Sequence, residues 1–223
     1  MLNEYRQSLK CAYQDKRASL KGEIERQLIH LFTGIILIIL IYMAGDLALS
    51  ILIFLLIFYV VVSLIILSNK LPPSLSAFIC KWGRPSKQTI PLKGTILLFC
   101  GIIVSFLLFP EKIVYASIAI VAFGDSIATA VGVLIGTHKL PYSDKKTVEG
   151  TLSGIIAAFL AASFFVSPFQ ALIGAVGGML LESVVDLQII TEVNSQIVFK
   201  FFLNDNFLIP VFSGLLMFLL EFI

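Results

Sequence analysis

Long apolar runs constrain this chain more than any other feature of its sequence. Hydrophobic residues make up 58% of the 223 residues and charged residues only 13%, and the mean hydropathy is +1.00. Soluble domains with an ordinary charged surface are far less apolar. About 20 apolar residues in a helix cross a bilayer core. Seven runs of roughly this length predict seven spans, at 28–43, 47–67, 90–109, 113–136, 148–166, 169–185 and 207–223.

The same runs predict the fold class. In lipid every backbone polar group must be hydrogen-bonded within the protein, which leaves helices and closed β-barrels. The runs are too long and too uniformly apolar for barrel strands, which alternate. We therefore expect an all-α membrane helix bundle, with a basic amino-terminal segment at 1–27 and a single transmembrane domain at 28–223. Gly154, Gly174 and Gly178 in the fifth and sixth runs indicate closely packed helices.

Basic residues fall almost entirely on one side of the predicted membrane. Of the 16 Lys and Arg residues, only Lys112 lies on the opposite side. Because cytoplasmic loops carry an excess of Lys and Arg, this distribution predicts a cytoplasmic amino terminus and supports the count of seven spans. Residues 1–27 fit either an amphipathic helix on the inner surface or a solvated basic tail.

One carboxylate lies in the middle of the fourth apolar run. Asp125 follows Gly124 and precedes Ser126 in an otherwise apolar segment, and a charge at the centre of a bilayer costs on the order of 3 kcal/mol. A metal ion or a lysine from the following loop would compensate this charge. The small and polar neighbours would let a ligand approach the backbone, although a structural acid hydrogen-bonded between helices also fits the sequence.

A lysine-rich loop with glycines follows the same run. Gly132 and Gly136 belong to a small-residue stripe, which by itself indicates only helix packing. Helix N-termini and lysines both suit phosphate groups, while lysines in a cytoplasmic loop also follow from the positive-inside rule alone. Glu149 either caps the next helix or binds a divalent cation that bridges phosphate oxygens. The candidate phosphate-binding residues of this loop are Lys139, Lys145, Lys146, Thr147 and Gly150.

Further polar residues lie at the predicted cytoplasmic ends of other runs. Glu182, with a second acid one turn later, indicates either a shared cation or a pair hydrogen-bonded to its neighbours. Asp205 and Asn206 precede the last run and are either part of a site or a helix cap. His30, one turn after Arg26, is either a base or phosphate contact or an interfacial anchor.

Taken together, these residues resemble the membrane family that contains dolichol kinase, phytol kinase and the CTP-dependent diacylglycerol kinases, and more distantly the phosphatidate cytidylyltransferases. The ordered set covers nearly the whole chain. One position departs from the pattern, since the kinases usually carry a basic pair where this chain has Arg26-Gln27. The matching positions are Arg26, His30, Gly34, Gly124, Asp125, Ser126, Ala128, Gly132, Gly136, Lys146, Thr147, Glu149, Gly150, Thr151, Gly154, Glu182 and 205–210.

The carboxyl-terminal part distinguishes two branches of this superfamily. Cytidylyltransferases carry a longer motif there, with Lys-Arg and Lys-Asp pairs and a His-Gly-Gly followed by acids, and nothing similar follows Glu182. The segment 205–210 is instead similar to the Asp-Asn-x-x-Ile-Pro of the lipid kinases. The resemblance therefore favours a kinase over a CDP-lipid synthase, which is kept as an alternative. An ion-coupled transporter with Asp125 and Glu182 on an ion path is the second alternative.

The resemblance implies transfer of the γ-phosphoryl group of CTP to the hydroxyl of a lipid alcohol, with Mg²⁺. The alcohol, an isoprenoid such as phytol or dolichol or a diacylglycerol, would come from the bilayer and the nucleotide from the cytoplasm. No nucleic acid partner is expected. The sequence does not identify the lipid, and it leaves open whether the protein forms a homodimer. The membrane is either a prokaryotic plasma membrane or an endoplasmic reticulum or organelle membrane.

The resemblance and the positions of the residues together assign three groups of site residues. The catalytic residues are Asp125, which is also the candidate base, Lys146 and Glu149. The metal candidates are Asp125, Glu149, Glu182 and Asp205. The nucleotide-binding candidates are Arg26, His30, Gly124, Ser126, Gly132, Gly136, Lys139, Lys145, Thr147, Gly150 and Asn206.

Overall fold

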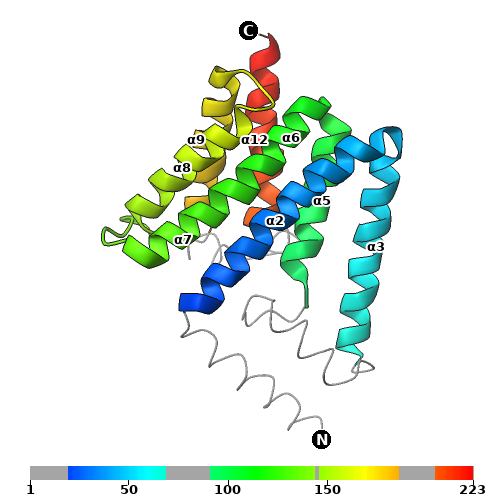
Figure 1. Ribbon diagram of the computed structural model, residues 1–223, viewed down its shortest axis with the longest axis horizontal. Helices are drawn as coiled ribbons and strands as arrows, with labels where there is room; N and C mark the ends of the chain where they lie inside the picture. The colour runs from blue at the N-terminus through cyan, green and yellow to red at the C-terminus, as the bar shows by residue number, and fades with distance from the viewer. Residues whose placement is uncertain (1–19, 69–90, 144–145, 186–203, 223) are drawn as a thin grey trace, which may run out of the picture.

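The computed structural model describes residues 20–68, 91–143, 146–185 and 204–222, and these residues form a helical bundle (Figure 1). Within them, β pairing is limited to one isolated bridge between Lys139 and Thr147. The predicted all-α fold is confirmed. Lys145 and most of the predicted amino-terminal segment lie outside the described residues.

Each predicted apolar run contains a helix. The helix of the second run begins at the residue after a 3₁₀ turn, and the fourth run holds one long rod with a π-helical turn in its middle. The elements are α2 (Leu20–Ala44), η1 (Gly45–Leu47), α3 (Ala48–Leu67), α5 (Lys93–Leu108), α6 (Glu111–Ala119), η2 (Ile120–Asp125), α7 (Ser126–Ile135), α8 (Val148–Ala162), α9 (Pro168–Val185), α12 (Asp205–Leu219) and η3 (Leu220–Phe222).

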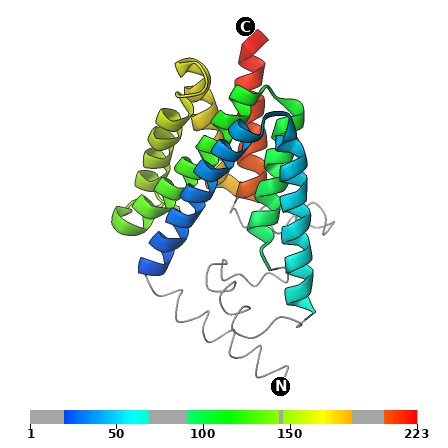
Figure 2. The ribbon, with the colours of Figure 1, turned by 45° about the vertical axis from the view of Figure 1, so that its right-hand side comes forward.

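Four helical stretches of the described residues are long and apolar enough to cross a membrane. They are Gly22–Leu67, Glu111–Ile135, Pro168–Val185 and Asp205–Phe222. The first stretch contains both α2 and α3, which run in opposite directions on either side of η1 (Figures 1 and 2). Helices α5 and α8 are apolar but shorter. These helices are compatible with an integral membrane protein, and the count of seven spans stays a prediction.

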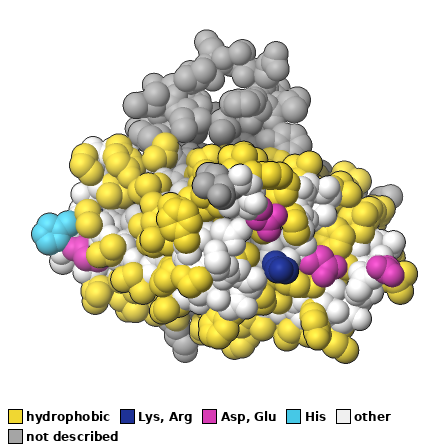
Figure 3. All heavy atoms as spheres, turned by 90° about the horizontal axis from the view of Figure 1, so that it is seen from above, with side chains coloured by type: hydrophobic (Ala, Val, Ile, Leu, Met, Phe, Trp, Pro, Cys, Tyr) yellow, Lys and Arg dark blue, Asp and Glu magenta, His cyan; other side chains and the backbone are white. Residues whose placement is uncertain are grey.

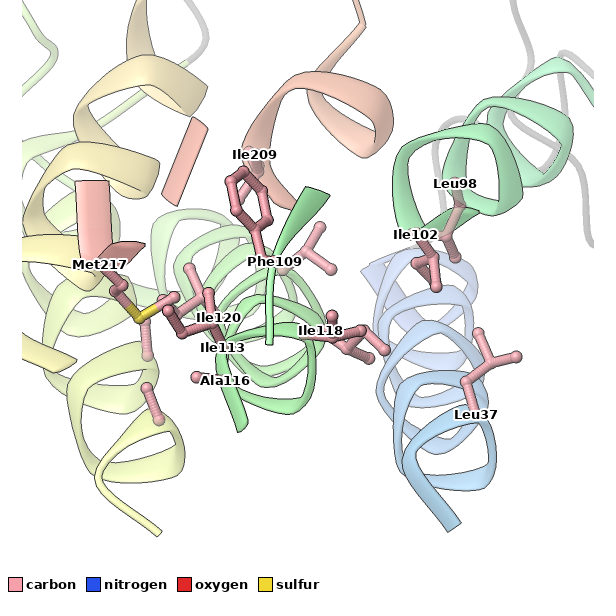
Figure 4. Close-up of a cluster of buried hydrophobic side chains, with 14 of the residues drawn as sticks. Leu37, Leu98, Ile102, Phe109, Ile113, Ala116, Ile118, Ile120, Ile209 and Met217 are labelled. Atoms are coloured by element: carbon pink, nitrogen blue, oxygen red, sulfur yellow. The ribbon is translucent and has the colours of Figure 1, made fainter. Parts of the chain in front are cut away.

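The continuous rod formed by α6, η2 and α7 is the centre of the bundle. It contacts α2, α5, α8, α9 and α12. Its middle is fully packed, because Ile113, Ile118 and Ile120 have no exposed surface. Figure 4 shows these side chains between Leu37 and Ile102 on one side and Met217 on the other. A residue near the end of this core, such as Asp125, is therefore fixed from several sides at once.

Glycines allow the helices around this rod to approach closely. A Cβ atom added to Gly154 of α8 would lie 2.7 Å from the Ala128 Cβ of α7. One added to Gly174 of α9 would lie 2.8 Å from the Met217 Cγ of α12. The close packing predicted for these glycines is confirmed, as expected for helices that associate in lipid through small residues.

The outer surface of the bundle is apolar along its length and polar at its ends. Helix α3 buries only Ala48, Leu52 and Ser63, and large hydrophobic side chains such as Phe54 are exposed. An apolar outer face of this extent suits contact with lipid rather than water. The face that carries the end of α12 is largely hydrophobic, with a few acidic side chains (Figure 3). Asp46, Glu111, Lys112 and Glu221 belong to turns and helix ends on this side.

The opposite end carries most of the basic side chains that the structure describes. Arg26 lies in the first turns of α2, Lys93 begins α5, and Lys139 and Lys146 lie in the connection from α7 to α8. In Figure 1 the start of α2 and the end of α7 lie at the lower end, away from the carboxy terminus. This separation agrees with the direction of the positive-inside rule.

The predicted orientation can be tested with single cysteines at the two ends. In a background with Cys11, Cys80 and Cys100 replaced by serine, we expect His138→Cys to react with an impermeant maleimide only from the cytoplasmic side. We expect Glu221→Cys to react only from the outside, since both positions are exposed and lie at opposite ends. Labelling intact cells and inverted vesicles measures the difference. Reaction of both cysteines from the same side would contradict an odd number of spans between them.

Candidate functional site

Asp125 is the last residue of the π-helical turn η2. A π turn inserts one extra residue into a helix and widens it locally, and such turns often occur at functional sites. The turn lies where the rod leaves the packed core, so the side chain of Asp125 is only 2% exposed. The structure therefore holds a carboxylate at a defined and nearly water-free position.

The contacts of this carboxylate come from its own helix and from α2. Thr129, one turn later, donates a hydrogen bond of 3.3 Å to Asp125 Oδ1. His30 Nε2 lies 3.7 Å from Asp125 Oδ2, with the histidine side chain 17% exposed. A neighbouring imidazole can exchange a proton with a carboxylate or donate to it. Among the described residues, the lysine that the sequence offered as a partner is absent from these contacts, and His30 takes its place.

Helix α2 is tied to the rod at the same level. The Ser126 hydroxyl donates to the backbone carbonyl of Gln27 at 3.1 Å. Gln27 is 3% exposed and its Nε2 donates to Glu23 Oε1 at 2.9 Å. Glu23 also binds the guanidinium of Arg26. The structure thus brings His30, Asp125 and Ser126 to one interface, while the printed contacts of Arg26 are with Glu23 of its own helix. It adds Gln27, which the sequence showed only as a departure from the kinase pattern.

The connection from α7 to α8 folds back as a short hairpin. The Val148 N–H donates to the His138 carbonyl at 2.8 Å, and the Leu140 N–H donates to the Lys146 carbonyl at 3.0 Å. At its end Thr147 is the N-cap of α8, with its hydroxyl oxygen accepting from the Gly150 N–H at 3.2 Å. This hairpin turns the side chain of Lys146 towards α9.

Lys146 forms an ion pair with Glu182 of α9. The glutamate side chain has no exposed surface and the lysine side chain is 19% exposed. Within the described residues Glu182 Oε2 has no hydrogen-bond partner, so half of this buried carboxylate remains available to a ligand. Next to it, the hydroxyls of Tyr142 and Ser183 lie 2.9 Å apart, which holds the hairpin against the end of α9.

Met179 of α9 connects the surroundings of Asp125 with those of the ion pair. Gly124, the neighbour of Asp125, packs against the side chain of Met179. Glu182 follows Met179 by three residues, about one helical turn on the same face of α9. The bundle therefore holds two buried carboxylates. One lies beside an imidazole and the other beside an ammonium group.

Glu149 closes the hairpin rather than pointing into the bundle. Its carboxylate accepts hydrogen bonds from the Thr137 hydroxyl at 2.8 Å and from the His138 N–H at 3.1 Å. It also lies 2.6 Å from His138 Nδ1, on a side chain that is 81% exposed. The sequence offered two roles for Glu149, and capping of α8 was wrong, because Thr147 is the N-cap and Glu149 contacts the other side of the hairpin. Binding of a divalent cation stays a prediction.

Asp205 and Asn206 form the first turn of α12. Asn204 is the N-cap, with its side-chain oxygen accepting from the Asn206 N–H at 3.1 Å. Asp205 is 8% exposed and its Oδ1 also accepts from that N–H, at 2.9 Å. Asn206 Nδ2 donates to the Gly94 carbonyl at 3.1 Å. Asn206 therefore connects α12 to α5. The N-cap of α12 is Asn204, not Asp205 or Asn206.

The glycines assigned to nucleotide binding lie at helix contacts. A Cβ on Gly150 would come within 2.7 Å of the Ala128 carbonyl oxygen, and one on Gly132 would lie 3.1 Å from Thr147 Oγ1. A Cβ on Gly136 would meet the methyl group of Thr147 at 2.7 Å, and one on Gly124 would meet the Ala158 Cβ at 3.2 Å. These positions serve the approach of α7, α8 and α9, and their contact with a nucleotide stays a prediction.

No three His, Cys, Asp or Glu side chains of the described residues gather into a preformed metal site. Asp125, Glu149, Glu182 and Asp205 are therefore separate candidates rather than one cage. Magnesium in phosphoryl-transfer sites is commonly held by one or two carboxylates together with substrate phosphates. A nearly buried carboxylate such as Asp125, which contacts no lysine of the described residues, fits that kind of site.

The comparisons with known proteins identify no family. No family model matches the chain, and no solved structure matches it. An 83-residue segment, 37% of the chain, is 35% identical to an uncharacterized protein of Methanocaldococcus jannaschii. The match spans 40% of that protein's length. This relative carries no assigned activity that bears on the site.

The ion pair between Lys146 and Glu182 makes a specific prediction about stability. Removing one partner of a buried pair leaves an uncompensated charge, so we expect Lys146→Met to lose about 3 kcal/mol of unfolding free energy. The double variant with Glu182→Gln should recover most of this loss. Denaturant titration in detergent, followed by far-UV circular dichroism, measures each variant. Lys112→Met, which changes an exposed lysine at the other end, is the control. If the losses of the two single variants simply add in the double variant, the pairing of Lys146 with Glu182 is contradicted.

Proposed function

We propose that this protein is an integral membrane kinase that transfers the γ-phosphoryl group of CTP to the hydroxyl of a long-chain lipid alcohol. The observation that carries the proposal is the buried carboxylate of Asp125, held beside His30 and Thr129 inside an apolar bundle. Acidic groups in such surroundings cost several kcal/mol and usually mark functional sites. The donor nucleotide and the choice of branch rest on the family resemblance.

The location suits two substrates of opposite solubility. A lipid alcohol diffuses within the bilayer and a nucleotide arrives from water, so their reaction requires a site where helices meet the cytoplasmic surface. Asp125 lies toward the end of the bundle that carries Arg26, Lys139 and Lys146. Positive charge there would attract and hold a polyphosphate.

The chemistry assigns the proton to Asp125. The alcohol oxygen forms a bond to the γ-phosphorus, the bond from that phosphorus to the β-bridging oxygen breaks, and the hydroxyl proton passes to the carboxylate. The products are a lipid phosphate and CDP. Phosphoryl transfer needs positioning and charge neutralisation more than covalent assistance, and a positioned base contributes about 10²- to 10⁴-fold. His30, 3.7 Å away, would position the carboxylate and relay its proton.

The remaining candidates would organise the phosphates. Lys146, with Lys139 and Lys145, would bind phosphate oxygens, and its ammonium group would then be shared between Glu182 and the nucleotide. Mg²⁺, when bound, would neutralise charge on the β- and γ-phosphates, and Asp125 would hold it, with Glu149, Glu182 or Asp205 as further candidates. The free oxygen of Glu182 supports a second polar contact at this position.

A labelling assay tests the proposal directly. Purified protein in mixed micelles, given CTP labelled at the γ position and a panel of phytol, geranylgeraniol, dolichol and diacylglycerol, should label one class of alcohol and release CDP. Asp125→Asn should reduce the rate at least 100-fold while leaving the unfolding transition in place. Asp46→Asn, an exposed acid at the opposite end, is the matched control and should retain activity.

Two outcomes would refute the assignment. Release of pyrophosphate with CMP retained on a phosphorylated lipid would identify a cytidylyltransferase, whose substrate needs no base because its phosphate is already ionised. Turnover by Asp125→Asn close to that of the unmodified protein would exclude the carboxylate from the chemistry. Substituting ATP or GTP for CTP in the same assay measures the nucleotide preference.

A further inference from the structure

Two buried polar atoms on α2 lack a hydrogen-bond partner within the described part of the chain. They are Gln27 Oε1 and His30 Nε2, on residues spaced by three and therefore on one face of the helix. That face lies against the rod, because the Gln27 carbonyl accepts from Ser126 and His30 approaches Asp125. Unsatisfied buried polar groups cost free energy and require an explanation.

The orientation of the Gln27 amide follows from its neighbour. A carboxylate can only accept hydrogen bonds, so the group that faces Glu23 must be the NH₂ of the amide, as the 2.9 Å contact has it. Glu23 is itself held by Arg26. The amide is thereby fixed with its oxygen, an acceptor, directed away from Glu23 and left without a donor from the described residues.

The chemistry around this oxygen selects for an alcohol over an anion. Gln27 Oε1 can only accept a hydrogen bond, and so can each oxygen of a phosphate, so this atom offers a phosphate no hydrogen bond. A hydroxyl group carries one donor and two acceptor lone pairs. In the bound state it can donate to Gln27 and accept from His30 Nε2 when that nitrogen carries its hydrogen. Its hydrogen would turn from Gln27 to Asp125 for the transfer step. This also accounts for glutamine at a position where the lipid kinases usually carry a second basic residue.

Large apolar side chains are exposed on α2 next to this position. Leu28, Ile29 and Phe32, which surround Gln27 and His30 in the sequence, expose 50%, 42% and 57% of their surface on the outer side of α2. A lipid chain lying along this apolar surface would keep its hydrocarbon in the bilayer. Its terminal hydroxyl would enter between α2 and the rod, next to Asp125.

We infer that Gln27 and His30 form the binding position for the hydroxyl group of a lipid alcohol, at the interface of α2 with η2 and α7. The inference rests on the proposed kinase function and names the acceptor side of its site. Gln27 is in this view a positioning residue, while Asp125 takes part in the chemistry.

Photoaffinity labelling tests this position without turnover. The full chain in detergent micelles is labelled with hexadecanol that carries a diazirine near its hydroxyl, and geranylgeraniol or its methyl ether competes. The ether keeps the tail and one oxygen but cannot donate. We expect geranylgeraniol to compete roughly tenfold better than the ether with the unmodified protein, as for a site built to bind a hydroxyl. In Gln27→Met, which keeps the volume and removes the acceptor, the two competitors should differ by less than about twofold.

Gln170→Met is the matched control, because Gln170 lies at the start of α9, at the other end of the bundle, and binds the Met217 carbonyl. It should keep the tenfold preference. Equal competition by alcohol and ether in the unmodified protein would overturn the inference, and so would a preference retained by Gln27→Met. Competition by CTP without Mg²⁺ would assign the position to the nucleotide instead. An alcohol preference without phosphoryl transfer would overturn only the kinase proposal.

Discussion

Keeping carboxylates inside an apolar helix bundle requires polar partners fixed within reach, and this requirement organises the whole basic end of the protein. Asp125 receives Thr129 and His30, while Glu182 receives Lys146. Each partner arrives from a different segment, so α2, α9 and the hairpin before α8 must all close on the central rod. The glycine contacts between α7, α8 and α9 make that closure possible, since larger side chains would hold the helices apart.

The sequence predicted the helices well because they depend mainly on the length of each apolar run, which can be read directly from the sequence. Where backbone N–H and C=O groups must hydrogen-bond within their own segment, such runs form helices. All seven runs contain one. Helix ends were less accurate: α2 begins at Leu20, eight residues before the predicted run. The π turn at Ile120–Asp125 was not predicted. Its only local hint is Gly124, and a single glycine within an apolar helix is equally typical of close helix packing.

The contacts between site residues were harder to predict than the residues themselves. Sequence alone brought His30, Asp125 and Ser126 together only as a pattern, and the structure places them at one interface. The choice of Glu182 as the partner of Lys146 depends on how the hairpin folds back, which no local pattern encodes. Gln27 was noted only as a departure from the basic pair of the kinases and was not assigned to the site, because glutamine carries no charge. Its role depends on which way its side-chain amide points. The hydrogen bond to Glu23, one helical turn away, fixes that orientation.

The π turn has a consequence for how this rod can change over evolution. Its i→i+5 hydrogen bonds take up one residue more than an α turn, so the extra residue widens one turn while the helices on either side keep their orientation. A single-residue deletion between 120 and 125 would leave a regular helix of about 3.6 residues per turn that suits lipid equally well. Ser126 and the glycines of α7 would still face α2 and α8, whereas the turn that ends at Asp125 would narrow. Helix packing and the position of the carboxylate are therefore separable properties of the same segment, and only the second depends on the π turn.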